Sequence, residues 1–430
     1  MKRFILSGGS LLGISALLSK GLSYVRDRLL TDIFDTDKVD LVFAAFRIPD
    51  FFFYLFVGAT ISVIFIPRLS DIKDNEDQKK FVSSFFWGVA VFFGTLSLAG
   101  SFLAEYLTQI FATGFDSELQ TQIAELAKYL FGSVFLLSIS GVFAAFLQSH
   151  HRFASIALAP IFYIGAICSA LFVFQDQFGI LIVGYAAIAG AGLHFLINFI
   201  SFFLNKGRIG FFWKEPVSAF KNFKTDFFQR VLNNSAFQLN QTADVIIASF
   251  LLSGSVAAFS IGSNLGHILL SIVGFSVANS AFPKIAKSKS DPTKQKQIII
   301  NSLKWILFFT IPASIIGGLL SEQILELLFN FSEQQLYMTK TVFFWTVISL
   351  PFACTLPILS RVFLANDDSR TPLIINATSL TIATIIAATL SLRVLPPETA
   401  ILGLAIGNFS ANTFGALIFG FMVWRRFKQN

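Results

Sequence analysis

Charged residues are scarce in this sequence, since Asp, Glu, Lys and Arg make up only 13% of its 430 residues. Soluble domains carry about a quarter charged residues, so an ordinary water-facing surface is excluded. Hydrophobic residues instead make up 54%, Phe alone occurs 54 times, and the mean hydropathy is +0.70. This composition predicts a multi-pass membrane protein.

Cysteine and histidine are also scarce, with two Cys and four His in the whole chain. Cys168 and Cys354 both lie in apolar stretches, and their spacing matches neither a metal site nor a disulfide framework. The sequence has no HExxH motif and no Cys/His cluster. We therefore expect no resident cofactor and no metal-dependent catalysis. The four histidines are His150, His151, His194 and His267.

Long apolar runs recur along the whole chain. A membrane-spanning helix needs about twenty mostly apolar residues to cross a hydrocarbon core of about 30 Å. Twelve runs meet this requirement, and their linkers are too short for a separate soluble domain, so we predict an all-α integral membrane fold. The runs are 4–30, 40–67, 81–105, 126–148, 153–174, 179–204, 228–251, 256–282, 297–318, 337–363, 371–391 and 400–424.

Lys and Arg gather at alternate ends of these runs, which marks the cytoplasmic side of a membrane protein. Both termini should therefore be cytoplasmic. The net charge of +7 follows from these loops and suits an anionic lipid surface better than nucleic acid. The apolar run after Lys2 and Arg3 is too long for a signal peptide and lacks a cleavage site, so we expect a retained helix. The inner-end cations include Lys79, Lys80, Arg152, Lys206 and Arg208.

Two segments half a chain apart resemble each other, residues 57–68 and 273–284, at an offset of 216. Each begins with Val-Gly and ends with Pro and a basic residue. An offset of six spans, an even number, relates the two halves by an axis along the membrane normal. We therefore predict two six-helix lobes, residues 1–215 and 216–430, around a central cavity, as in alternating-access transporters. A duplicated scaffold that does not transport is the alternative.

Ionisable side chains inside a span are costly, so each one is a functional candidate. In the second run, Asp40, Arg47 and Asp50 fall within one helix face about 80° wide, and we expect this face to look into the cavity. Pro49 should kink the helix there and free backbone carbonyls. In the alternative interpretation Asp40 caps the start of the helix, and Arg47 pairs with one of the two aspartates.

Arg26 belongs to the outer part of the first run, where it either faces the cavity or reaches the head groups with Asp27 as its local partner. Lys20 lies about two turns deeper, and we expect it on roughly the same side. Because guanidinium groups bind phosphate oxygens bidentately, Arg26, Arg47 and Lys20 suit an anionic, phosphorylated substrate. We attribute the glycines of this run to helix packing rather than to a hinge. They are Gly8, Gly9, Gly13 and Gly21.

Asp244 is a charged residue in the seventh run. The later runs contain few other ionisable residues. Thr384 and Asn408 would lie near it if the spans of the second lobe pack as predicted. These three residues form a candidate site for a monovalent cation. A buried, hydrogen-bonded carboxyl group is the alternative interpretation.

Several motifs of this chain resemble the MurJ/MviN lipid II flippases. The resemblance is specific in LSKGLSYVRD at 18–27, FAAFRIPD at 43–50 and FIPRL at 65–69, and it continues more loosely through 252–256, 282–283 and 368–372. The family belongs to the multidrug/oligosaccharidyl-lipid/polysaccharide exporter superfamily, which has two six-helix lobes. The resemblance implies movement of undecaprenyl-pyrophosphate-linked peptidoglycan precursor, lipid II, from the inner to the outer leaflet of the bacterial cytoplasmic membrane. Membrane potential is then the expected drive.

The resemblance also implies roles for residues of the first lobe. The family's cavity Arg–Asp pair falls on Arg26 and Asp27, and its second-span aspartate falls on Asp40. An earlier first-span arginine falls on Lys20, which keeps the charge and loses the fork, and a basic second-span position falls on Arg47. These five residues are the substrate-binding candidates.

Other family positions are changed in this chain. Two family arginines fall on Phe53 and Asn264, where the charge is lost. The family's sodium site uses a seventh-span aspartate that matches Asp244, whereas its eleventh-span partners fall near Thr384 and Ala387. The family has fourteen spans and twelve are predicted here. Three explanations of this difference are open. Either the lipid tail is accommodated differently, or the chain is truncated, or it is a divergent relative.

Three classes of function compete. A lipid II flippase is the leading hypothesis, and a flippase for another lipid-linked oligosaccharide or a cation-coupled multidrug exporter would use the same scaffold. An enzyme would need clustered carboxylates, and residues 71–77 are interpreted as a solvated loop instead. We expect a monomer without cofactor, driven by membrane potential or a monovalent cation. Its expected partners are a lipid-linked anionic substrate, membrane lipids and cell-wall synthesis proteins.

Overall fold

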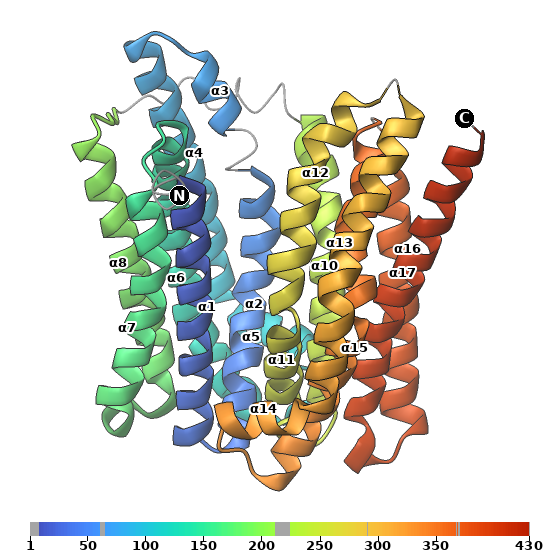
Figure 1. The fold of residues 1–430 in the computed structure, drawn as a ribbon. Coiled ribbons are helices and arrows are strands. Elements are labelled where there is room, and N and C mark those ends of the chain that lie inside the picture. The colour runs from blue at the N-terminus through green and yellow to red at the C-terminus, as the bar shows by residue number, and fades with distance from the viewer. Residues whose placement is uncertain are drawn as a thin grey trace. The chain divides into compact units, whose positions relative to one another are not determined.

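The computed structural model describes residues 8–60, 65–210, 224–289, 291–366, 368 and 370–429. All regular elements within these ranges are helices, which confirms the all-α prediction (Figure 1). Parts of the first and second predicted runs, residues 4–7 and 61–64, lie outside the described residues. The cations Lys2, Arg3, Lys214 and Lys221 do so as well.

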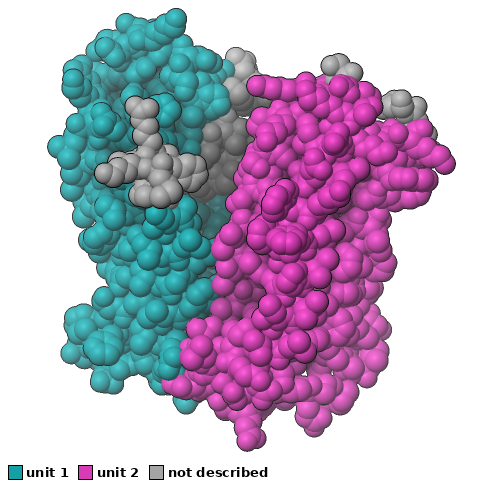
Figure 2. Space-filling model, in the orientation of Figure 1, with its two compact units in different colours: residues 1–238 teal, residues 239–430 magenta. Residues whose placement is uncertain are grey.

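The chain forms two compact units, Met1–Gln238 and Leu239–Asn430, which Figure 2 shows in separate colours. Helix α10, Lys224–Ser249, contributes to both units, because Gln238 and Leu239 are consecutive residues within it.

The first unit is built from long helices that run alongside one another (Figure 1). Aspartate side chains cap the starts of two of these helices. Asp74 accepts hydrogen bonds from the backbone N–H groups of Glu76 and Asp77, and Asp116 accepts one from the backbone N–H of Leu119. Gly179, with φ of +53°, ends another. Besides the start of α10, the elements are α1 Gly8–Ile33, α2 Thr36–Thr60, α3 Ile66–Asp71, α4 Asn75–Phe102, α5 Ala104–Phe111, α6 Ser117–Ser149, α7 Ala154–Phe178, η2 Gly179–Leu181 and α8 Ile182–Leu204.

The second unit repeats this use of long apolar helices joined by short connections. Asp291 caps one helix through the N–H of Lys294, and Ser332 caps another through the N–H of Gln335. After the end of α10, the elements are α11 Ser255–Gly266, η3 Leu270–Gly274, α12 Phe275–Lys287, α13 Pro292–Leu319, α14 Ser321–Leu328, α15 Glu333–Leu364, α16 Arg370–Thr389, η4 Leu390–Val394, η5 Pro397–Thr399 and α17 Ile401–Gln429.

Eight candidate membrane spans meet the length and hydropathy requirements within the described ranges, and one of them, Ala154–Leu204, combines α7 and α8. Helices α1, α2 and α10 coincide with the three remaining predicted runs and have 26, 25 and 26 residues. Helix α1 carries Lys20, Arg26, Asp27, Arg28 and Asp32, and α2 carries Asp37, Lys38, Asp40, Arg47 and Asp50. The predicted substrate-binding residues therefore lie on two long helices that each carry five charged residues.

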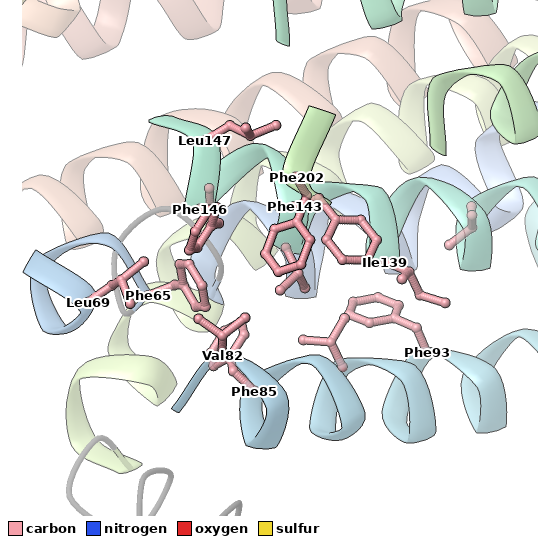
Figure 3. Packing of buried hydrophobic residues seen from close by; sticks show 14 residues of the cluster. Phe65, Leu69, Val82, Phe85, Phe93, Ile139, Phe143, Phe146, Leu147 and Phe202 are labelled. Carbon is pink, nitrogen blue, oxygen red and sulfur yellow. The ribbon is translucent and has the colours of Figure 1, made fainter. Parts of the chain in front are cut away.

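A Phe-rich core fixes α4, α6 and α8 against one another in the first unit. Figure 3 shows side chains of α4 and α6 pointing toward one another across this cluster. The Phe146 and Phe202 ring centroids are 4.6 Å apart, and those of Phe143 and Phe202 are 5.0 Å apart. Phe143 and Phe202 are completely buried. Offset aromatic contacts of this kind stabilise a packed arrangement beyond simple burial, so the cluster is a rigid base for the loops beside it.

Candidate functional site

A buried ion pair joins two consecutive residues of α1. Arg26 donates to Asp27 Oδ1 from Nη2 at 2.6 Å and from Nε at 2.9 Å. The Asp27 side chain is 2% exposed and that of Arg26 is 19% exposed. The Arg26 guanidinium also lies over the ring of Phe46 on α2, 5.9 Å from its centroid. Because a guanidinium has five N–H donors, Arg26 can bind a phosphate oxygen while it keeps Asp27.

Arg47 on α2 is held by the backbone and side chain of one glutamine. Its Nη2 donates to Gln238 O at 2.7 Å and to Gln238 Oε1 at 2.9 Å. Gln238 is the last residue of the first unit and is buried. Asp50 interacts electrostatically with both Arg47 and Arg26, so the two guanidinium groups belong to one charged cluster.

Two tyrosines complete this cluster. Tyr163 on α7 interacts electrostatically with Asp50, with Arg26 and with Tyr54 of α2. Helix α7 reaches this position because Gly190 of α8 lies against its backbone, where an added Cβ would be 2.6 Å from the carbonyl oxygen of Tyr163. The cluster on α1, α2 and α7 therefore combines two guanidinium groups, two carboxylates and two phenols. This set is suited to binding phosphate oxygens.

The structure excludes one interpretation of Asp40. Helix α2 begins at Thr36, so Asp40 is its fifth residue and does not cap the start of the helix. Asp40 is buried, at 3% exposure, whereas Arg47 and Asp50 on the same helix are half-buried. The helix is continuous past Pro49, which preserves the shared face predicted for the three charged residues.

The expectation that Lys20 and Arg26 share a side of α1 is wrong. Helix α1 is continuous from Gly8 to Ile33, and six residues along an α-helix rotate the side chain by about 240°. The separation is therefore nearer one and two-thirds turns than two. Lys20 is half-buried and lies on a different face of α1 from Arg26.

Close packing does not explain two of the α1 glycines. A Cβ added at Gly13 or at Gly21 would meet no atom within 4 Å, and both residues are exposed. The packing interpretation is therefore wrong at these two positions. Gly8 and Gly9 lie at the start of α1, where the side-chain surroundings are outside the described part of the chain.

The second unit brings the three cation-site candidates together. Asn408 on α17 donates to Asp244 Oδ2 at 3.4 Å, and Asn240 donates to the same oxygen at 3.0 Å. Thr384 on α16 donates to Asn240 Oδ1 at 3.1 Å, so it joins the group through Asn240. Asp244 and Asn240 are both buried. Both asparagines present N–H donors to Asp244, as the alternative interpretation of a buried, hydrogen-bonded carboxyl group expects. The amide oxygens would join the carboxylate and the hydroxyl as cation ligands only after the two amides turn.

The acidic segment 71–77 has structural roles. Asp74 caps α4, Glu76 lies 3.7 Å from Lys79, and Asp77 lies 3.4 Å from Lys80. Only residues 72–74 form a loop, because Asp71 ends α3 and Glu76 and Asp77 lie in the first turn of α4. The contacts are those of a helix start rather than of a catalytic cluster.

Sequence reasoning missed four residues of these sites, which are Tyr54, Tyr163, Gln238 and Asn240. Tyr163 lies in the apolar run of α7, and only the packing of α7 on α1 and its electrostatic interactions reveal its place. Asn240 left a weak signal, since it lies four residues before Asp244 and therefore on the same face of α10.

Residues 31–430 match the family model described as lipid II flippase MurJ. A relative from Thermotoga maritima, named "Probable lipid II flippase MurJ", is 26% identical over 391 residues, which cover 88% of this chain and 78% of the relative. A relative of the same name from Helicobacter pylori strain J99 is 28% identical over 403 residues, 87% of this chain and 85% of the relative.

Solved structures show the same fold. One described as "Lipid II flippase MurJ, inward closed conformation" has a TM-score of 0.79 at 24% identity and covers 96% of this chain and 87% of that chain. An inward-facing multidrug resistance MATE family transporter of the MOP superfamily has a TM-score of 0.74 at 15% identity and covers 96% of each chain. Both matches support an architecture of two lobes. Since the family model covers nearly the whole sequence, the chain belongs to the MurJ family, whose members are multi-pass membrane transporters and not enzymes.

Proposed function

We propose that this protein moves an undecaprenyl-pyrophosphate-linked peptidoglycan precursor, lipid II, from the inner to the outer leaflet by alternating access. The observation that carries the proposal is the cluster of Arg26 and Arg47 with Asp50, in a chain that belongs to the MurJ family. The names of the relatives, which match over most of their length, support the same substrate.

The charges of the cluster account for binding and release. Arg26, Asp27, Arg47 and Asp50 sum to zero when all are ionised, so the empty site does not hold an uncompensated buried charge. A pyrophosphate brings strong acceptors that compete with Asp27 and Asp50 for the two guanidinium groups. On binding, the phosphate oxygens of the substrate replace the carboxylate oxygens of the protein as acceptors for the guanidinium groups. Because one set of acceptors replaces another, the affinity stays moderate, which a transporter needs in order to release its substrate.

The membrane arrangement is part of the proposal. Helices α1, α2 and α10 would span the membrane with the other long helices, which makes twelve spans in two lobes of residues 1–215 and 216–430. Cations at the ends of α4, α6 and α8, among them Lys79, Arg152 and Lys206, support a cytoplasmic position for both termini. We place the protein in the bacterial cytoplasmic membrane as a monomer, with cell-wall synthesis proteins as partners.

A monovalent cation at Asp244 is the proposed coupling ion. Asn240, Thr384 and Asn408 surround this carboxylate with amide and hydroxyl groups, and the second unit alone contains all four residues. Binding of a cation would neutralise a carboxylate that is otherwise buried at a free-energy cost. Membrane potential would then contribute to the drive.

A second candidate function is export of another lipid-linked oligosaccharide or of a drug. Two observations favour it, the uncharged residues Phe53 and Asn264 where the resemblance expects arginines, and the fold shared with MATE transporters. Under this alternative the phosphate-binding cluster would still be used for a lipid-linked glycan, whereas a cationic drug would not need it.

Complementation of a conditional lipid II flippase knockout tests the proposal. Wild type and Arg26→Ala are compared at matched expression in the membrane, with Arg28→Ala as the matched control. Arg28 lies on the same helix, is 42% exposed and pairs with Asp32. Rescue by wild type and by Arg28→Ala, but not by Arg26→Ala, is the expected result. Failure of correctly inserted wild type would favour another lipid-linked substrate.

A further inference from the structure

A basic pocket of about 280 Å³ lies at one end of the first unit, apart from the Arg26 cluster. It is formed by the first turns of α4, the residues after the end of α6 and the residues after the end of α8. Lys79, Lys206 and Arg208 supply three cationic side chains, and His150 supplies an imidazole. No carboxylate is among the described residues that line it. Such a concentration of positive charge favours an anionic ligand.

The floor of the pocket is rigid. Val82 and Phe146 line it and also belong to the Phe-rich core, where Figure 3 labels both. The His150 ring stacks on Phe146 with centroids 4.2 Å apart, and its Nδ1 lies 2.9 Å from the Phe146 carbonyl oxygen. Because a carbonyl only accepts, Nδ1 carries the proton of this contact, and Nε2 is the nitrogen left to engage a ligand.

The segment after α8 is fixed against α4. The Gly210 N–H donates to Ser83 Oγ at 2.8 Å, and Trp87 Nε1 donates to Gly210 O at 3.1 Å. Gly207 lies so close to Phe202 that an added Cβ would be 2.5 Å from its ring. Arg208, between these two glycines, is therefore held beside the pocket by its backbone.

Lys206 has a backbone conformation that is unusual for a lysine. Its φ is +64°, in the left-handed region that non-glycine residues adopt at a free-energy cost. Hydrogen bonds from the N–H groups of Lys206 and Gly207 to the carbonyls of Phe203 and Phe202, at 3.0 and 2.9 Å, maintain this turn. Strain of this kind is concentrated at binding sites, where the surrounding structure fixes a side chain in a useful place.

We propose that this pocket binds a phosphate group, held by Lys206, Arg208 and Lys79 with His150 at its edge. Its volume is near the lower limit for small-molecule sites, which suits a phosphate or a phosphodiester head group and is too small for a glycopeptide. The site is therefore separate from the transport substrate and does not depend on the proposed function. The phosphate comes either from a phospholipid head group or from a free phosphate in solution.

Calorimetric titration of the purified full-length protein in neutral detergent tests this proposal. The probes are inorganic phosphate and short-chain phosphatidylglycerol, with diacylglycerol of the same chain length, which has no phosphate, as the control lipid. Binding of phosphatidylglycerol alone identifies a lipid head group as the source, and binding of inorganic phosphate identifies free phosphate. Either result supports the site. Binding of neither probe, or equal binding of diacylglycerol, overturns it.

Charge-removing variants locate the binding. Lys206→Asn replaces the charged side chain by an uncharged residue that tolerates positive φ. Arg208→Gln removes the charge and keeps much of the side-chain length. Each change should weaken binding about tenfold, because a hydrogen bond to a charged group contributes at least about 1.5 kcal/mol. Lys80→Gln is the matched control, since Lys80 neighbours Lys79 on α4 but does not line the pocket.

The unfolding midpoint of each variant is measured in parallel, so that loss of fold is distinguished from loss of the site. Either of Lys206→Asn and Arg208→Gln is sufficient if the other does not fold. Unchanged affinity in folded Lys206→Asn and Arg208→Gln, or an equal loss in Lys80→Gln, would contradict the proposal.

Discussion

Arg26 donates two hydrogen bonds to a single carboxylate oxygen of Asp27, its neighbour in the chain, at 2.6 and 2.9 Å. Two consecutive helical residues point about 100° apart, so this contact requires both side chains to bend along the helix surface. The pair presents a guanidinium beside Asp50 while its own counter-charge stays buried. It is therefore a compensated cation that can still bind an anion.

Arg26→Lys should lower transport about tenfold or more although the charge is kept. A lysine supplies a compact point charge and cannot hold Asp27 and a phosphate with one planar fork. Reconstituted transport of fluorescent lipid II, or the rescue assay, measures the effect against Arg28→Lys. Wild-type rates in Arg26→Lys would mean that charge alone matters at this position.

Asp27→Ala should destabilise the protein more than the double change Arg26→Ala with Asp27→Ala. The single change leaves Arg26 buried without its partner, which costs about 3–5 kcal/mol for a buried pair, whereas the double change removes both charges. Thermal unfolding in detergent gives the order of the midpoints. A double variant that is less stable than Asp27→Ala would contradict the pairing.

Arg47→Ala should abolish transport while the protein remains inserted and folded. Arg47 is half-buried and is held through Nη2 by Gln238, so its loss removes a positioned cation without opening the Phe-rich core. Gln238→Ala is the matched variant, because it removes only the side-chain acceptor and keeps the backbone carbonyl. We expect an intermediate loss of transport there, and full activity in Arg47→Ala would exclude Arg47 from the site.

Much of the fold follows from apolar run length. Within the described residues the predicted runs fall on helices, although the eighth run is divided among α11, η3 and α12. Backbone groups in a membrane must be satisfied within a helix, which leaves few alternatives. The charged candidates Arg26 and Arg47 could be identified for a related reason, since charge inside such a run is costly and therefore rare.

Contacts between helices could not be predicted from the apolar runs in the same way. The place of Tyr163 depends on the contact of Gly190 with the α7 backbone, which a single sequence does not indicate. Lys20 and Arg26 lie on different faces of α1 because six residues fall about a third of a turn short of two full turns. The group around Asp244 was anticipated in part, but Asn240, which connects Thr384 to it, becomes evident only from the hydrogen bonds.

Asp244→Asn should abolish any stabilisation by a monovalent cation. The amide keeps the size of the side chain and removes the negative charge that would bind the ion. Thermal midpoints are compared in sodium, lithium and choline chloride at equal ionic strength, with Asp291→Asn as a control outside the group. A cation-specific shift in wild type that persists in Asp244→Asn would place the ion elsewhere.

Asp368 should stabilise the start of α16 in a pH-dependent way. Its carboxylate accepts hydrogen bonds from the N–H groups of Arg370 and Thr371 at 3.1 and 3.0 Å and from Thr371 Oγ1 at 2.6 Å. Burial alone would raise the pKa of Asp368, but these hydrogen bonds and the charge of Arg426 outweigh it and hold the pKa below its ordinary value. Asp368→Ala should therefore cost about 1 kcal/mol of stability at neutral pH.

The sign of the pH dependence follows from the lowered pKa of Asp368. A carboxyl group whose folded-state pKa is depressed contributes its stability above the unfolded-state pKa of about 3.9, and this contribution is lost as pH falls through the folded-state pKa. The difference in unfolding midpoint between wild type and Asp368→Ala should thus be constant from about pH 6 to 8 and shrink below about pH 4. Thr371→Val, which removes only the hydroxyl donor, should show part of the same loss. A difference that grows on acidification would reverse the sign and exclude the capping role, because protonation can only weaken these three hydrogen bonds.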